Sequence, residues 1–491
     1  MINVHVVHPY DCDVLITGGG PAGSALAYHL SQKGLNVIVI EAQRFPRDKV
    51  CGDGVSPIAL SELHNIGITG LDGFAAANEI NKVGLFIRED KVFIDLEKED
   101  HLPYHARIIP RLQLDNWIHE AAEKKGAVYW EDSRVTDYFI TENMIVADVK
   151  RNDASIRVKA KVIVGADGSN STIARVLNGS KPSDEYQLLG LRAYYENVNG
   201  PRDRVDIFFS DENYPGIYWM FPLGKNEANI GLAMVASTLP KKEVHVKELL
   251  TDHIKKNKGI SERIGSGSIK GKIYGWPLNF FNPANKISAS RLLLVGDAAG
   301  LINPLSGDGI QYALLSARWA AESLIKCFEQ NDFSGAALSS YHAKIKDELA
   351  YDFALSNLLI QFARNKALTP LWMEIMIVLI ARAKVDKSYA HIIASIFEGT
   401  YPSYKALTPA FIGKSILQGG LHAGINTVTG MLQGPEYWMR KGKDLNRIAG
   451  NIADSIKNNP AGNLRWLTGL VKNGAGVAGH LLKSVRQNNQ P

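Results

Sequence analysis

Residues 13–23 read DVLITGGGPAG, an apolar strand that enters a glycine turn and then a helix. Gly18 permits the tight turn, Gly20 lets the backbone approach a pyrophosphate, and Gly23 lets the helix pack closely. Residues 37–40 predict the next strand, and Glu41 at its tip is placed to hold the hydroxyls of an adenosine ribose. Strand, helix, second strand and acidic residue in register predict a dinucleotide-binding unit rather than an ordinary turn.

Length and composition are those of a globular protein with two or three structural units in its 491 residues. The first residues lack a basic signal region, and no run of about 18 apolar residues predicts a spanning helix. The three cysteines, Cys12, Cys51 and Cys327, suit neither a disulfide framework nor a zinc site. We therefore expect a cytoplasmic protein that has no metal site.

The charge of the chain is unevenly distributed. The net charge is +5, but residues 404–491 carry 11 Lys or Arg and 3 Asp or Glu, so this tail is +8 and the rest is −3. One interpretation is a solvated helical surface. The other is peripheral attachment to an anionic lipid headgroup layer. No nucleic-acid partner is expected.

The pattern becomes helical almost throughout after about residue 337. Its most apolar part, residues 371–381, is too short to span a bilayer and predicts a buried helix or a lid over an apolar pocket. Residues 466–486 suggest an amphipathic helix that lies on a membrane or packs on the body. A second GxGxxG at 474–479 is rejected as a nucleotide site because no strand precedes it.

Two further glycine turns follow apolar strands. Residues 165–168 read GADG, and residues 296–300 read GDAAG, followed by Pro304, Gly307 and Gly309. Arg111 and Asp115 fit an RxxxD pattern at the start of an expected helix. In this chain order, the three turns resemble the flavoprotein monooxygenase-like superfamily, whose FAD-binding fold is like that of p-hydroxybenzoate hydroxylase.

This resemblance implies FAD as the cofactor. Asp297 would accept hydrogen bonds from the ribityl hydroxyls, and the helix after Gly309 would direct its positive end at the flavin. The residues expected to bind the cofactor are Gly18, Gly20, Ala22, Gly23, Glu41, Ala42, Arg47, Cys51, Gly52, Arg111, Asp167, Gly168, Gly296, Asp297, Pro304, Gly307, Gly309 and Ile310.

The expected fold is α/β, with a Rossmann-like FAD-binding domain interleaved with a mixed β-sheet domain, and a mainly helical C-terminal region. The FAD-binding domain would comprise residues 1–80, 105–180 and 285–335. The substrate-binding sheet domain would comprise residues 81–104 and 181–284, and the helical region with its basic tail residues 336–491.

A narrower resemblance comes from residues 45–54, FPRDKVCGDG, and from Trp219-Met220-Phe221-Pro222 with Asn229-Ile230-Gly231 downstream. These are similar to the geranylgeranyl reductase family, whose members saturate prenyl double bonds of lipids, quinones or chlorophyll precursors. The resemblance implies that Cys51 lies beside the flavin, although it fits a small buried hydrophobe as well. Lys49 or Arg47 would lower the pKa of its thiol and favour thiolate.

Two departures from the family pattern concern the substrate site. Ile217 stands where relatives often carry tyrosine, and residues 277–280 read PLNF where relatives tend to have Pro-x-Gly-Gly. The identity of the substrate is therefore open, whereas the cofactor is not affected.

The resemblance implies a reductase in which reduced flavin gives hydride to one alkene carbon and an acid gives a proton to the other. Trp219, Tyr218 and Phe221 are expected to form an aromatic wall, with core packing as the alternative. Cys51 is a candidate proton source or redox partner. The external electron donor would be NADPH or a ferredoxin.

Two other functions stay open at this point. One is an oxygen-using hydroxylase or halogenase of the same superfamily; the run 217–222, IYWMFP, lacks the first tryptophan of the halogenase pattern Trp-x-Trp-x-Ile-Pro. The other is a non-catalytic flavin-bound lipid carrier.

Overall fold

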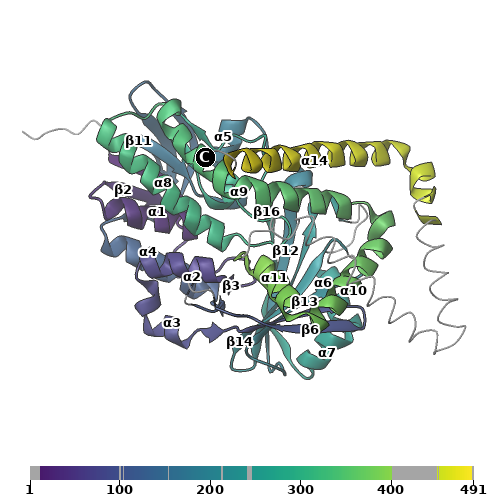
Figure 1. Ribbon diagram of the computed structural model, residues 1–491. Coiled ribbons are helices and arrows are strands. Elements are labelled where there is room, and N and C mark those ends of the chain that lie inside the picture. The colour runs from purple at the N-terminus through teal and green to yellow at the C-terminus, as the bar shows by residue number, and fades with distance from the viewer. Residues whose placement is uncertain are drawn as a thin grey trace, which may run out of the picture.

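The computed structural model describes residues 11–98, 101–102, 104–152, 154–211, 214–239, 246–400, 450–451 and 453–488. The predictions about the first ten residues, and about the basic tail between residues 404 and 449, lie outside the described residues. The described chain has the mixed α/β architecture predicted from the sequence, with two large sheets and a helical C-terminal part (Figure 1).

The first sheet contains the glycine-rich opening of the chain. Its strand order is β17-β18-β11-β1-β2-β8, and the β9–β10 hairpin extends from β11. β1 pairs in parallel with both β2 and β11, and its residues 14–17 are buried as a continuous run, as is typical of a strand covered on both faces. The strands are β1 (Cys12–Thr17), β2 (Val37–Ile40), β8 (Val128–Trp130), β9 (Ser133–Ile140), β10 (Ile145–Arg151), β11 (Ala154–Gly165), β17 (Ser288–Ala289) and β18 (Leu292–Leu294).

Three helices cover this sheet: α1 (Pro21–Ser31), α4 (Arg111–Lys124) and α8 (Ile310–Gln330). α1 packs against both α4 and α8, as Figure 1 shows on the side of the molecule away from the second sheet. The close approach of α1 depends on glycine. Gly18 has a φ of +94°, and a Cβ at Gly23 would lie 1.9 Å from the carbonyl oxygen of Gly18. The predicted strand–turn–helix opening is confirmed.

The second sheet has the order β16-β12-β15-β14-β13-β5-β6 and is antiparallel except between β13 and β5. Its strands are β5 (Lys82–Ile87), β6 (Asp90–Asp95), β12 (Gln187–Glu196), β13 (Arg204–Phe209), β14 (Ile217–Gly224), β15 (Glu227–Val235) and β16 (Ser268–Asn279). α6 (Val246–Lys256) and α7 (Lys258–Ile264) supply apolar side chains to the core on one face of this sheet.

Short elements connect the two sheets. A small three-stranded sheet follows the Cys51 loop, and three short helices complete this part of the chain. They are β3 (Gly54–Val55), β4 (Asn78–Glu79), β7 (Arg107–Ile108), α2 (Pro57–Asn65), α3 (Asp72–Ala76) and α5 (Thr172–Asn178).

The C-terminal part is helical, as predicted, and comprises α9 (Gly335–Ala363), α10 (Thr369–Val385), α11 (Lys387–Glu398) and α14 (Pro460–Asn488). Residues 474–479, the rejected second glycine motif, lie within α14. No helix among the described residues is both long enough and apolar enough to cross a bilayer.

The prediction of a buried helix at residues 371–381 needs correction. In α10, Leu371 and Ile375 are 42% and 40% exposed, whereas Met373 and Ile380 pack with the apolar residues of β5 and β6. The helix lies on the edge of the second sheet, so only one side of it is covered. Apolar residues occupy every position of residues 371–381 except Glu374, so the sequence does not reveal this asymmetry.

Candidate active site

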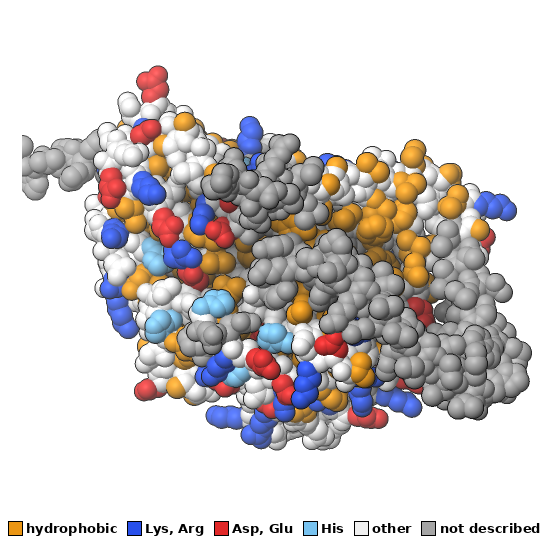
Figure 2. Space-filling view, viewed as in Figure 1, with side chains coloured by type: hydrophobic (Ala, Val, Ile, Leu, Met, Phe, Trp, Pro, Cys, Tyr) orange, Lys and Arg blue, Asp and Glu red, His pale blue; other side chains and the backbone are white. Residues whose placement is uncertain are grey.

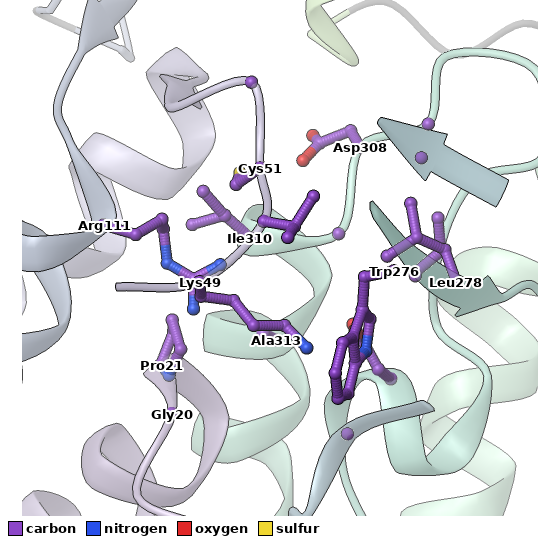
Figure 3. Close-up of a pocket in the computed structure, with 18 of the residues that line it drawn as sticks. Gly20, Pro21, Lys49, Cys51, Arg111, Trp276, Leu278, Asp308, Ile310 and Ala313 are labelled. Atoms are coloured by element: carbon purple, nitrogen blue, oxygen red, sulfur yellow. The ribbon is translucent and has the colours of Figure 1, made fainter. Parts of the chain in front are cut away.

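A cavity of about 1000 Å³ lies between the glycine turns of the first sheet and one face of the second sheet. Most residues predicted to bind the cofactor, and two of the predicted aromatic residues, line it. These are Gly18, Gly20, Ala22, Glu41, Ala42, Arg47, Cys51, Gly52, Arg111, Asp167, Gly168, Trp219, Phe221, Asp297, Gly307, Gly309 and Ile310. Figure 3 labels four of the predicted cofactor residues, Gly20, Cys51, Arg111 and Ile310.

Three predicted cofactor residues, Gly23, Gly296 and Pro304, are not in the cavity wall. Gly23 brings α1 against the β1 turn, as described above. Gly296 has a φ of +56°, and a Cβ there would lie 3.0 Å from the Cβ of Ala22. The two glycines bring backbone segments close together, which is the role that the sequence predicted for Gly23, and their part in cofactor binding stays a prediction.

Tyr218 does not belong to the aromatic wall. Its ring is fully buried and stacks on His253 of α6, with 3.4 Å between ring centroids. Successive side chains of a strand point to opposite faces of the sheet. Trp219 and Phe221 therefore face the cavity, whereas Tyr218 belongs to the core under α6 and α7.

One end of the cavity has the groups that a dinucleotide requires. The N-terminus of α1 has no side-chain cap, and a Cβ at Gly20 would meet no atom closer than 3.7 Å, so backbone and helix dipole are open to a pyrophosphate. Glu41 accepts the backbone N–H of Gly19 at 2.8 Å and lies at the tip of β2. Asp297 is at the glycine turn of residues 296–300. Burial raises the pKa of Asp297, and the positive charges of Lys49 and Arg111 oppose this increase. This donor set fits FAD.

A chain of buried charges runs from Glu41 towards Cys51. Arg47 lies 3.3 Å from Glu41 and donates to Asp115 at 2.9 Å. Arg111 donates to the two carboxylate oxygens of Asp115 at 2.5 and 2.7 Å. The RxxxD pattern is thus an ion pair within one turn of α4, which also holds the FPRDKVCGDG loop through Arg47.

The Cys51 thiol faces a different environment from the one predicted. Burial raises its pKa, and the cation that opposes this effect most strongly is Arg111 rather than Lys49 or Arg47. Its partial exposure is to the cavity, whose lining is largely apolar. The predicted thiolate is therefore corrected to a neutral thiol, because desolvation outweighs the nearby positive charge.

The backbone around Cys51 is fixed by a second network. Asn229 Nδ2 donates to the carbonyl oxygen of Cys51 at 2.7 Å and to Asp53 Oδ2 at 2.8 Å, and Trp219 Nε1 donates to Asn229 Oδ1 at 2.9 Å. The Tyr194 hydroxyl donates to Asp53 at 2.7 Å. Asp53 has a φ of +64°, a strained conformation that costs on the order of 1 kcal/mol and persists because these contacts hold it.

Sequence reasoning missed two residues of the site and gave a third the wrong role. Trp276 of β16 carried no motif, because only the register of the sheet brings it to the cavity. Asp308 lay between the flagged Gly307 and Gly309, and an acidic residue inside a glycine loop was a signal that could have found it. Lys49 does not activate Cys51; its ammonium lies over Trp276.

The other end of the cavity is apolar. Its walls are aliphatic side chains of the second sheet, of the segments next to its strands and of β7, and α11 contributes Ala394 and Glu398. The aliphatic residues are Ile80, Val83, Leu96, Ile108, Val205, Ile207 and Ile217. Ile217, the first departure from the family pattern, and Leu278 of the second departure both line the cavity.

Comparison with known proteins identifies the family. An FAD binding domain family matches residues 11–348. Digeranylgeranylglycerophospholipid reductase 1 of Methanopyrus kandleri is 30% identical over 350 residues, which are 70% of this chain and 88% of that protein. The chain belongs to the geranylgeranyl reductase family. It is an FAD-dependent oxidoreductase, and this result removes the non-catalytic carrier as an interpretation.

One further relative and one solved structure are similar to this geranylgeranyl reductase family member. Menaquinone reductase of Mycolicibacterium smegmatis is 30% identical over 346 residues, 66% of this chain and 78% of that protein. A geranylgeranyl bacteriochlorophyll reductase-like protein of Thermoplasma acidophilum has the same fold, with a TM-score of 0.65 at 23% identity over 82% of this chain and 95% of that one. The predicted FAD-binding fold is confirmed.

Proposed function

We propose that the protein reduces carbon–carbon double bonds in the prenyl chain of a lipid or a quinone. The observation that carries this proposal is the continuity of one cavity, which has dinucleotide-binding groups at one end and aliphatic side chains at the other. The names of the relatives support the same substrate class, since they include a phospholipid reductase and a quinone reductase.

The side chains of the apolar end would bind the prenyl chain and exclude water from it. Trp219 and Phe221 lie in the wall beside the Cys51 loop, since a Cβ at Gly52 would be 3.2 Å from the Phe221 ring. Flat rings at this position hold an alkene in one plane, which reduces the entropy lost on reaching the reactive geometry. When bound, reduced FAD would supply the hydride, and NADPH or a ferredoxin would be the external reductant.

The second alkene carbon requires a proton, and two cavity groups are able to hold one. The Cys51 thiol is neutral because burial raises its pKa. Burial also raises the pKa of Asp308 to about 6, although the backbone N–H groups of Gln311, Ile310 and Gly309 lower it. The structure orients Asp308 and Cys51 toward the same part of the cavity (Figure 3).

An anaerobic single-turnover experiment tests this function against the oxygen-using alternatives. The holoprotein is reduced with dithionite and mixed with geranylgeraniol in detergent. We expect recovery of the visible flavin absorption and a product heavier by two hydrogens. Reoxidation or product that depends on added oxygen would instead show a hydroxylase or halogenase.

Peripheral attachment to an anionic membrane is part of the proposal, because a lipid substrate is delivered from a bilayer. Supporting it, α14 exposes an apolar stripe made of Leu464, Leu467 and Val471, which are 66%, 50% and 73% exposed. The opposite side of the helix packs on α9, where Trp466 donates to the carbonyl oxygen of Gln361. Figure 2 shows apolar side chains gathered over α14.

Charge on α14 favours an anionic partner. Arg465 and Lys472 are exposed beside the stripe, and residues 460–488 contain no Asp or Glu. An apolar stripe bordered by cations is typical of helices that lie in the interface of an anionic bilayer.

A further inference from the structure

The Cys51 turn and the Trp219 ring are both fixed by one side chain, the amide of Asn229. Its nitrogen donates to the carbonyl oxygen of Cys51 at 2.7 Å, and its oxygen accepts from the Trp219 indole at 2.9 Å. Cys51 and Asn229 are 178 positions apart in the sequence, so the amide joins the FAD-side loop to the second sheet.

The amide is buried completely, and its geometry leaves little freedom. Asn229 is 0% exposed, and its nitrogen makes a second bond to Asp53 at 2.8 Å. The backbone N–H of Asp53 donates to Cys51 Sγ at 3.3 Å. Asn229 therefore orients the thiol twice, once through the Cys51 carbonyl and once through Asp53.

The position of Trp219 depends on the same residue. A Cβ at Gly231 would lie 2.0 Å from the indole ring, and a Cβ at Gly52 would lie 3.4 Å from its nitrogen. The ring thus packs against Gly231 of β15 and lies close to the Cys51 turn. This packing and the bond to Asn229 Oδ1 together restrict the rotamer of the ring.

We propose that Asn229 is a positioning residue that holds the Cys51 thiol and the Trp219 ring in one fixed relation across the active-site cavity. This role rests on the proposed function and extends it. Asn229 would keep the wall that confines the alkene at a constant position relative to the thiol beside it. Asn229 itself acts through these two residues and does not need to touch the substrate.

The test uses the full-length holoprotein and the variant Asn229→Ala. The first measurement is the rate at which iodoacetamide alkylates Cys51, located by peptide mass spectrometry. We expect a roughly tenfold faster rate in the variant, because loss of a buried hydrogen bond frees the turn. The control is Asn357→Ala, which removes a buried amide on α9 that donates to Phe281 and leaves the cavity untouched. An equal Cys51 rate in wild type and Asn229→Ala would overturn the proposal.

The second measurement is single-turnover reduction of geranylgeraniol by the double variant Asn229→Ala/Trp219→Phe. If Asn229 acts through the indole, the double variant loses less rate than the product of the losses in Asn229→Ala and Trp219→Phe, with FAD content unchanged. Multiplying losses would show independent roles and refute the coupling. This second measurement depends on the proposed function, whereas the alkylation measurement does not. If the wild-type protein fails to reduce geranylgeraniol, the alkylation rate of Cys51 therefore still tests the role of Asn229.

Trp219→Phe provides the test if Asn229→Ala does not accumulate as folded holoprotein. This change keeps an aromatic ring in the wall, makes it smaller and removes the bond to Asn229 Oδ1. We expect Cys51 alkylation about threefold faster than in wild type. An unchanged rate in this variant would contradict the link between indole and thiol.

Discussion

The ammonium of Lys49 lies 4.1 Å from the centroid of the Trp276 ring in the wall of the cavity (Figure 3). Burial lowers the pKa of Lys49 to about 8, with Arg111 and Arg47 acting in the same direction and Asp297 against it. The aromatic face retains a cation that has lost much of its hydration. Lys49 is therefore a positive charge that is lost at mildly alkaline pH, near the site expected to bind a dianionic cofactor.

From this arrangement we predict that the affinity of the apoprotein for FAD falls as the pH rises through about 8. The charged form attracts the pyrophosphate, and deprotonation removes that attraction. Lys49→Met should bind FAD about tenfold more weakly at neutral pH and show no such pH dependence. Fluorescence titration with FAD measures both. A pH-dependent affinity that survives in the variant would assign the effect to another group.

Asp115 should be important for stability because it is the shared partner of two buried guanidinium groups. Asp115→Ala removes the carboxylate partner of the buried Arg111 and leaves Arg47 with Glu41 alone, so it should lower the free energy of unfolding by about 3 kcal/mol. Urea denaturation measures this loss. Glu348→Ala, which breaks the exposed pair with Lys344, is the control and should cost less than about 0.5 kcal/mol.

Narrowing the apolar end of the cavity should weaken substrate binding and leave the cofactor bound. Ala394 is a small residue of α11 in the cavity wall. Ala394→Phe places a ring in the space proposed for the prenyl chain, so the KM for geranylgeraniol should rise several-fold while FAD content is unchanged. Loss of FAD together with activity would instead show that the two ends are not separate binding regions.

The pH profile of the single turnover should identify the proton donor. If Asp308 gives the proton, the rate falls as the pH rises through about 6, because the acid form is lost there. Asp308→Asn would then be slow and independent of pH. If Cys51 gives it, the rate stays level through this range, since burial keeps the thiol protonated, and Cys51→Ser is the slow variant.

Replacing the apolar stripe of α14 with charge should release the protein from anionic membranes. We expect Leu467→Glu/Val471→Glu to reduce sedimentation with phosphatidylglycerol liposomes by about tenfold, with FAD retained. Phe139→Glu, on a strand of the first sheet and 47% exposed, is the matched control and should sediment as wild type does. Equal sedimentation of the stripe variant and wild type would exclude this surface. If the wild-type protein self-associates in the absence of liposomes and the stripe variant does not, the partner of the stripe would be a second copy of this chain.

The sequence by itself determined the backbone-level features of this protein. Gly18 and Gly23 predicted the turn and the helix approach, and Arg111 with Asp115 formed an RxxxD pattern whose two residues lie one helical turn apart, because these features depend on neighbours in the chain. The tertiary structure alone decided which side of β14 faces the cavity, so that Trp219 lines it and Tyr218 does not. It also decided the ionisation of Cys51. Packing by segments that are distant in the sequence determines the facing of these side chains and the ionisation of Cys51. The local spacing of residues does not encode this packing.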